Sequence, residues 1–158
     1  MLKSYLLTFF ISMVPLIELR GAIPFGTLIC DPALPLVNAY IVSIIGNMVP
    51  VPFIFFFARR ILEWGADKKY IGKFFTWCLN KGHKGGQKLI AKAGHGLYVA
   101  LIFFVGIPLP GTGAWTGTLA ASILDMDFKK SSVSVMLGVL LAGVIIGALS
   151  AVGINVLK

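Results

Sequence analysis

The sequence predicts an all-α integral membrane protein in which a re-entrant helical hairpin followed by a transmembrane helix occurs twice, as an inverted repeat. Hydrophobic residues make up 58% of the 158 positions and charged residues only 13%. The mean hydropathy is +0.91, far above what a soluble domain of this length needs. Four long apolar segments account for most of the chain, and two of them are interrupted by glycines and prolines: 4–30, 32–58, 97–124 and 131–157.

Segment length separates the spanning helices from the hairpins. About 20 helical residues cross a hydrocarbon core of about 30 Å. Segments 32–58 and 131–157 are uncharged and long enough to span. Segments 4–30 and 97–124 each contain two short apolar pieces around a central break, and pieces of that length fit a hairpin that enters and leaves on one side. The alternative is an ordinary spanning helix with a kink at mid-membrane.

The order of these elements predicts a single membrane domain over residues 1–158, built from two related halves. Gly26 and Gly117 lie at matching positions of the two broken segments, and Gly46 and Gly138 at matching positions of the two spans. Each half crosses the membrane once, so the halves have opposite orientations, as in many transporters. The expected boundaries are 1–60 for the first repeat, 61–95 for a cytoplasmic basic amphipathic linker and 96–158 for the second repeat.

The charge distribution predicts the topology. Nine of the fourteen lysines and arginines lie between Arg59 and Lys92, within a net charge of +8. In a chain this apolar, such a cluster indicates a cytoplasmic loop beside lipid head groups and not a nucleic-acid surface. We therefore expect a multi-pass plasma-membrane protein with both termini outside and membrane lipids as partners. Within the linker, a predicted helix has one apolar face made of Ile71, Phe74, Phe75 and Cys78, which fits either an interfacial helix or a helix packed on a partner subunit.

Glu18 and Arg20 are the most informative residues, because charges at bilayer depth cost about 2.5–3.5 kcal/mol each on insertion scales. On a regular helix, side chains two residues apart point about 200° apart. We expect Gly21 to unwind the turn, so that both charges face one cavity. Arg20 is then the candidate ligand of a phosphate or carboxylate, and Glu18 the carrier of a coupling proton. The alternative is a buried ion pair that pins the end of the hairpin.

Glycines and prolines around the two breaks complete the predicted site. Breaks expose helix ends, and the N–H groups at a half-helix N-terminus attract anions. Trp115 alone is better explained by packing, and Gly143 with Gly147 by helix packing or dimerisation. The predicted substrate-binding residues are Arg20, Gly21, Pro24, Gly26, Pro108, Pro110, Gly111, Thr112, Gly113, Trp115 and Thr116.

Enzyme signatures such as His-Glu-x-x-His and Gly-x-Ser-x-Gly are absent from the sequence, so we expect neither catalysis nor a cofactor or metal. The residues favour a proton-coupled transporter, working as a homodimer, for an anionic or amphiphilic substrate such as a lipid phosphate. Two alternatives stay open. One is a proton-coupled exporter of cationic drugs with Glu18 as the acceptor, and the other is a membrane scaffold that transports nothing.

Two motifs carry a resemblance to a known family. The runs Glu18–Gly26 (ELRGAIPFG) and Pro108–Gly117 (PLPGTGAWTG) resemble the small multidrug export proteins over nearly the whole chain. That family is similar in turn to the DedA (VTT-domain) superfamily. The resemblance implies a membrane transporter with two re-entrant hairpins, linked to movement of phospholipids or a polyprenyl-phosphate carrier. DedA proteins tend to carry an arginine in the second motif, whereas Gly111–Gly117 has none, which leaves Arg20 as the only arginine expected within the membrane.

Overall fold

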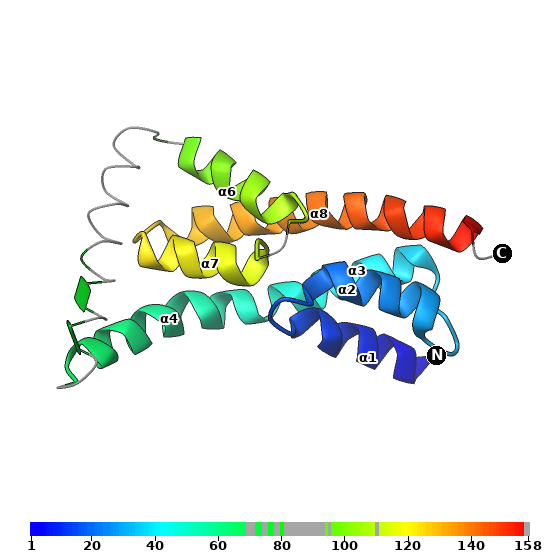
Figure 1. The fold of residues 1–158 in the computed structure, drawn as a ribbon, viewed down its shortest axis with the longest axis horizontal. Helices are drawn as coiled ribbons and strands as arrows, with labels where there is room; N and C mark the ends of the chain where they lie inside the picture. Colours follow the sequence, from blue (N-terminus) through cyan, green and yellow to red (C-terminus); the bar gives the residue numbers. More distant parts are fainter. Residues whose placement is uncertain are drawn as a thin grey trace.

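The computed structural model describes residues 1–68, 72–73, 76–77, 80, 94, 96–109 and 111–156, and all regular elements within these ranges are helical (Figure 1). The predicted interfacial face of Ile71, Phe74, Phe75 and Cys78 lies outside the described residues. The elements are α1 (Leu2–Met13), α2 (Glu18–Pro24), the π-helical turn η1 (Phe25–Ile29), α3 (Leu36–Met48), α4 (Pro50–Ala66), α6 (Gly96–Gly106), α7 (Ala114–Ile123) and α8 (Phe128–Val156).

Two long helical rods run along the longest axis of the molecule. One is α3 followed directly by α4, joined at Val49, and the other is α8 (Figure 1). Both rods are long and apolar enough to cross a membrane, which confirms the two predicted spans as candidates. The first rod extends further than predicted, since α4 continues beyond residue 58 to Ala66. Arg60 is exposed within this extension, so its long side chain reaches polar surroundings while the helix continues.

The two broken segments each fold into a pair of short helices, as predicted. The first hairpin consists of α1, a turn, and α2 with η1; the second consists of α6, a turn, and α7. We call residues 14–20 the first tip and residues 107–113 the second tip. The two tips lie near the middle of the molecule, and the hairpins extend from there toward opposite ends (Figure 1).

The break in the first hairpin is not where the sequence suggested, and the expected unwinding at Gly21 is wrong. Helix α2 runs through Gly21 and Pro24. The break lies instead at residues 14–17, because Pro15 forces Val14 into an extended conformation (φ −71°, ψ 130°) that ends α1. Pro24 is the last residue of α2, and a wider π-helical turn follows it, in which the Cys30 N–H donates to the Phe25 carbonyl at 2.9 Å.

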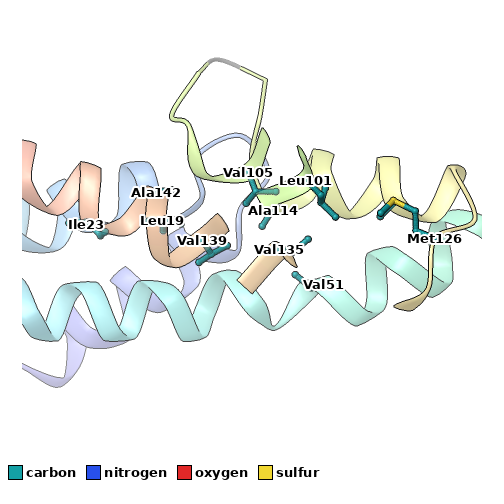
Figure 2. Packing of buried hydrophobic residues seen from close by; sticks show 11 residues of the cluster. Leu19, Ile23, Val51, Leu101, Val105, Ala114, Met126, Val135, Val139 and Ala142 are labelled. Atoms are coloured by element: carbon teal, nitrogen blue, oxygen red, sulfur yellow. The ribbon is translucent and has the colours of Figure 1, made fainter. Parts of the chain in front are cut away.

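Helix packing connects the two hairpins to both rods. Helix α1 packs on α3, and α6 packs on α8. The returning helices reach across to the other rod, because α2 contacts α8 and α7 contacts α4. The hydrophobic core lies along α8 where these elements converge (Figure 2): Leu19, Ile23, Val51, Leu101, Val105, Ala114, Ala121, Met126, Val135, Val139 and Ala142.

The outward surface is more apolar than parts of the interior. Phe10, Phe53, Phe56 and Val144 are among many large hydrophobic residues that are exposed. Several serines and threonines are buried instead, among them Ser12, which is 0% exposed. Helices in lipid gain little from burying leucine against leucine, and they associate through small and polar residues. This distribution therefore agrees with a membrane protein.

Glycines set how closely α8 approaches its neighbours. A β-carbon at Gly138 would lie 2.6 Å from Val105 Cβ and 2.8 Å from the Ile102 carbonyl oxygen. Gly143 faces the ring of Tyr40 in the same chain, so this member of the predicted dimerisation pair already has an internal contact. Homodimer formation stays a prediction.

We expect Gly138→Ala to lower the free energy of unfolding by about 1–3 kcal/mol, because the added methyl group forces α6 away from α8. Gly147→Ala is the matched control on the same helix, since nothing lies within 4 Å of its β-carbon position. Thermal unfolding in detergent measures both variants. Equal stability of the two would contradict the close packing of α6 on α8.

Candidate substrate site at the hairpin tips

The first tip carries Glu18 and Arg20, whose charged side chains contact the second hairpin. Pro15 ends α1, and Leu16 then takes a left-handed conformation with φ 71°. Glu18 also has a positive φ, of 50°, and begins α2. Left-handed backbone is strained for residues other than glycine, so the surrounding contacts must hold this turn in place. Glu18 and Arg20 thereby stand in the first turn of α2.

Glu18 caps the N-terminus of α7. Its Oε2 accepts a hydrogen bond from the Ala114 N–H at 3.1 Å, and its Oε1 accepts one from the Trp115 N–H at 3.0 Å. The first N–H groups of a helix lack intrahelical partners and favour a negative charge. The N-cap residue of α7 is Gly113, which has no side chain to serve them. The carboxylate of Glu18 fills that role from the other hairpin, and Glu18 is only 4% exposed.

Arg20 caps the opposite kind of helix end. Its Nη1 donates to the Leu109 carbonyl at 2.5 Å. Its Nη2 lies within hydrogen-bonding distance of the Val105 carbonyl at 3.2 Å, the Ile107 carbonyl at 3.3 Å and Thr112 Oγ1 at 3.0 Å. These acceptors belong to the last turn of α6 and to the second tip, where carbonyl groups lack helical partners and a positive charge is favoured. We call the bonds of Glu18 and Arg20 together the tip contact.

The different directions of the two charges follow from helix geometry. Because α2 is helical from Glu18 onward, side chains two positions apart diverge. Glu18 therefore meets the start of α7, while Arg20 meets the end of α6. The second hairpin presents these two ends on either side of its tip, so one charge pair serves both.

The second tip fits around these charges. Gly111 (φ 80°) and Gly113 (φ 149°) adopt backbone conformations that favour glycine, and a β-carbon on Gly113 would overlap the Glu18 carboxylate. Thr112 Oγ1 lies 2.9 Å from the Leu109 carbonyl oxygen, which folds the tip over Arg20. Trp115 donates its Nε1–H to the Met13 carbonyl at 3.1 Å, at the end of α1.

A pocket of about 860 Å³ lies against the tip contact. Its polar end contains Glu18, Arg20 and Thr112, and its walls come mainly from α4 and α7. The wall residues are almost all apolar. The lining residues are Pro15, Leu16, Glu18, Arg20, Phe53, Ile54, Phe57, Ala58, Ile61, Pro108, Leu109, Gly111, Thr112, Trp115, Thr116, Leu119, Ile123 and Ile146.

The structure brings together most of the predicted site residues. Arg20, Pro108, Gly111, Thr112, Trp115 and Thr116 line the pocket beside Glu18, and Gly113 lies under the Glu18 carboxylate.

Other predicted residues lie away from the pocket or outside the described chain. A β-carbon on Gly21 would meet Ile17, and Gly26 packs against Thr8 and Ala39. Pro24 lies within α2 and does not line the pocket, and Pro110 is outside the described residues.

Sequence reasoning missed the wall that α4 contributes. Phe53, Phe57 and Ile61 line the pocket at a spacing of four, which places them on one helical face. That spacing was visible in the sequence. A face turned to lipid has the same composition, however, so the pattern alone does not separate the two.

Comparison with known proteins identifies one family. Residues 18–145 match the model of the small multi-drug export protein family. The match begins at Glu18 and includes both tips apart from residues 14–17. No curated protein and no solved structure matches the chain.

We expect Gly113→Ala to be more destabilising than Gly111→Ala by about 2 kcal/mol, because the added methyl group also displaces Glu18 from two N–H groups. Both substitutions place alanine at a positive φ, but Gly113, at φ 149° and ψ −171°, lies in a region restricted essentially to glycine. The same two substitutions in Glu18→Ala protein measure that backbone strain without the carboxylate. Thermal unfolding in detergent compares them. Equal losses would mean that the Glu18 contact with α7 contributes nothing to stability.

Arg20→Lys tests the other half of the tip contact. A lysine ammonium is a single point donor and does not reproduce a planar guanidinium that reaches several acceptors. We expect a loss of about 2 kcal/mol in unfolding free energy. Arg60→Lys, on the exposed side of α4, is the matched control and should change stability by less than about 0.5 kcal/mol. Similar stability for both variants would argue against the capping role of Arg20.

Proposed function

Because the chain belongs to the small multi-drug export protein family, we propose that it is an exporter that moves an amphiphilic substrate with an anionic head group, such as a lipid phosphate, across the membrane. The family name suggests a membrane exporter, and two apolar helices of spanning length agree with it. The chemical class of the substrate is inferred from the pocket.

One observation carries this choice of substrate. Glu18 is 4% exposed beneath α7, whereas Arg20 is only partly buried, although both line the pocket. The charge that a ligand meets is therefore mainly positive. The apolar walls of α4 and α7 then accommodate a hydrophobic body, as in most small-molecule pockets with a few polar groups at one end.

Basic side chains at one end of the molecule indicate its orientation in the membrane. Arg60 and Lys68 lie at the end of α4, and Lys129 and Lys130 at the start of α8, and all four are exposed. Figure 1 places these two helix ends at the same end of the molecule. Exposed Glu63, Asp67, Asp125 and Asp127 lie at the same helix ends, so these residues do not form a net positive surface. The positive-inside rule counts lysines and arginines and favours the cytoplasmic side for this end. We propose that this end faces the cytoplasm of a plasma-membrane protein.

Glu18 is the proposed coupling group. As a carboxylate it accepts hydrogen bonds from two N–H groups of α7 and opposes the positive end of the helix dipole. One proton taken up by this carboxylate removes the charge and weakens both bonds. The start of α7 is then released from the first tip, and loss of the proton restores the contact. Proton uptake thereby changes one wall of the pocket.

We also propose re-entrant hairpins and an inverted, DedA-like repeat. The contacts of α1 with α3 correspond to those of α6 with α8, and the crossing contact of α2 with α8 corresponds to that of α7 with α4. Gly46 packs on Phe9 and Ser12 of α1, and Gly138 packs on Ile102 and Val105 of α6. Corresponding glycines with corresponding partners, three residues apart in each half, support a common origin for the two halves.

A second candidate is export of cationic drugs. The family name gives multi-drug export, and the carboxylate of Glu18 in the pocket lining would bind a cation. Transport in proteoliposomes separates the candidates. We expect uptake of a lipid phosphate that depends on the pH gradient, and its loss in Glu18→Gln. Transport of cationic drugs without transport of any lipid phosphate would instead establish the second candidate.

We expect Leu119→Trp to reduce lipid-phosphate transport at least about tenfold, because the indole occupies space that the substrate body needs. Leu119 lines the pocket and takes no part in the tip contact, so folding should be preserved. Leu137→Trp, on the exposed surface of α8, is the control and should transport normally. Normal transport by both variants would show that the substrate does not use this pocket.

A further inference from the structure

Polar side chains line the contact between α1 and α3. The buried residues of α1 are Ser4, Thr8 and Ser12, at a spacing of four. Those of α3 include Ser43 and Asn47, also at a spacing of four. Residues four apart share one face of a helix, so each helix turns a polar stripe inward. We call these five side chains the polar seam.

The two stripes lie against each other. A β-carbon at Gly26 would lie 2.7 Å from Thr8 Oγ1 and 3.3 Å from Ala39 Cβ, so Thr8 and Ala39 are close in space. Ser43 follows Ala39 by one helical turn, and Asn47 follows Ser43 by another. The seam therefore continues along α3 past Thr8, toward the junction with α4.

The far end of the seam reaches the first tip. A β-carbon on Gly46 would overlap Ser12 Oγ and would lie 2.5 Å from the Phe9 carbonyl oxygen. Gly46 precedes Asn47 directly, and Ser12 lies just before the turn that leads to Glu18. Figure 1 shows α1 running from the N-terminus toward the tips.

Several polar atoms in the seam lack partners. Ser4 and Ser12 donate to backbone carbonyls at 2.8 Å and 2.7 Å. Thr8 Oγ1, Ser43 Oγ and both amide atoms of Asn47 have no hydrogen-bond partner within the described chain. Thr8, Ser43 and Asn47 are each 0% exposed. An unpaired buried polar group lowers stability, and an apolar side chain at the same position would avoid that loss. These positions therefore favour an occupant that can form hydrogen bonds.

We propose that the polar seam is a water-filled route that delivers protons to Glu18 from the membrane side opposite the basic linker. Glu18 lines the pocket formed by α4 and α7. At the end of the seam, Ser12 directly precedes Met13, whose carbonyl accepts a hydrogen bond from Trp115 Nε1–H, and the Trp115 backbone N–H donates to Glu18. A water molecule in the seam gives one proton to the Glu18 carboxylate and regains one from its neighbour toward that side. Asn47 supplies both a donor and an acceptor to the last waters of this chain. The coupling role rests on the proposed function, but the entry of water does not.

Cysteine accessibility tests the entry of water without any transported substrate. Cys30 and Cys78 are first replaced by serine, and Ser43→Cys is compared with Ala142→Cys, which is also 0% exposed but lies in the hydrophobic core. A small charged methanethiosulfonate is added from the side opposite the basic linker. We expect it to label Ser43→Cys at least about tenfold faster than Ala142→Cys, since thiols react where water reaches them. Equal protection of both cysteines would overturn the proposal.

Proton uptake into proteoliposomes, followed with an entrapped pH dye, tests delivery to Glu18. Asn47→Leu has a similar volume but no polar atoms. We expect it to lower proton uptake at least about tenfold while its thermal stability stays the same or rises, because it removes unpaired buried groups. A purely structural asparagine would affect stability and leave uptake unchanged, and unchanged uptake would overturn proton delivery by the seam.

The proposed function and this inference fail in different ways. If the pocket binds no lipid phosphate, wild-type protein shows no binding of that probe in vesicles, while Ser43→Cys is still labelled. If the seam is dry, lipid-phosphate binding is retained and Ser43→Cys stays protected.

Discussion

Helix ends that meet inside the molecule impose the constraint on which this structure depends. The end of α6 and the start of α7 leave backbone groups without helical partners, and apolar surroundings offer none. Gly113 has no side chain to cap α7. Glu18 and Arg20 supply the missing partners from the other hairpin. At bilayer depth each charge costs about 2.5–3.5 kcal/mol, and each hydrogen bond to a charged group contributes about 1.5–3 kcal/mol, so about two bonds offset the cost of one charge.

The site follows from this constraint. Bringing the two tips together creates a polar surface at mid-molecule, and α4 and α7 enclose it with apolar side chains. A charge that caps a helix end also makes a reversible connection, because neutralising it weakens the cap. The same contact that stabilises the second hairpin therefore provides the proposed connection between proton uptake and the shape of the pocket.

Much of this arrangement was predictable from the sequence. Apolar segment lengths identify two spans and two broken segments, and charges in apolar surroundings single out Glu18 and Arg20. The position of the first break differs from the prediction. Gly21 and Pro24 are accommodated within α2, whereas Pro15, through its effect on Val14, ends α1. The partners of the charges were not predictable, since backbone groups at a helix end carry no residue signature. The seam had a signal in the spacing of Ser4, Thr8 and Ser12, but serines in an apolar helix also serve ordinary packing.

The central claim is that Glu18 and Arg20 hold the two tips together. Leu16 and Leu109 are both exposed, and one lies on each tip. With Cys30 and Cys78 replaced, spin labels at Leu16→Cys and Leu109→Cys measure the distance between the tips by double electron–electron resonance. We predict one short, narrow distance distribution at neutral pH, and a longer and broader distribution in the same labelled protein carrying Glu18→Ala. A distribution that Glu18→Ala leaves unchanged would contradict it.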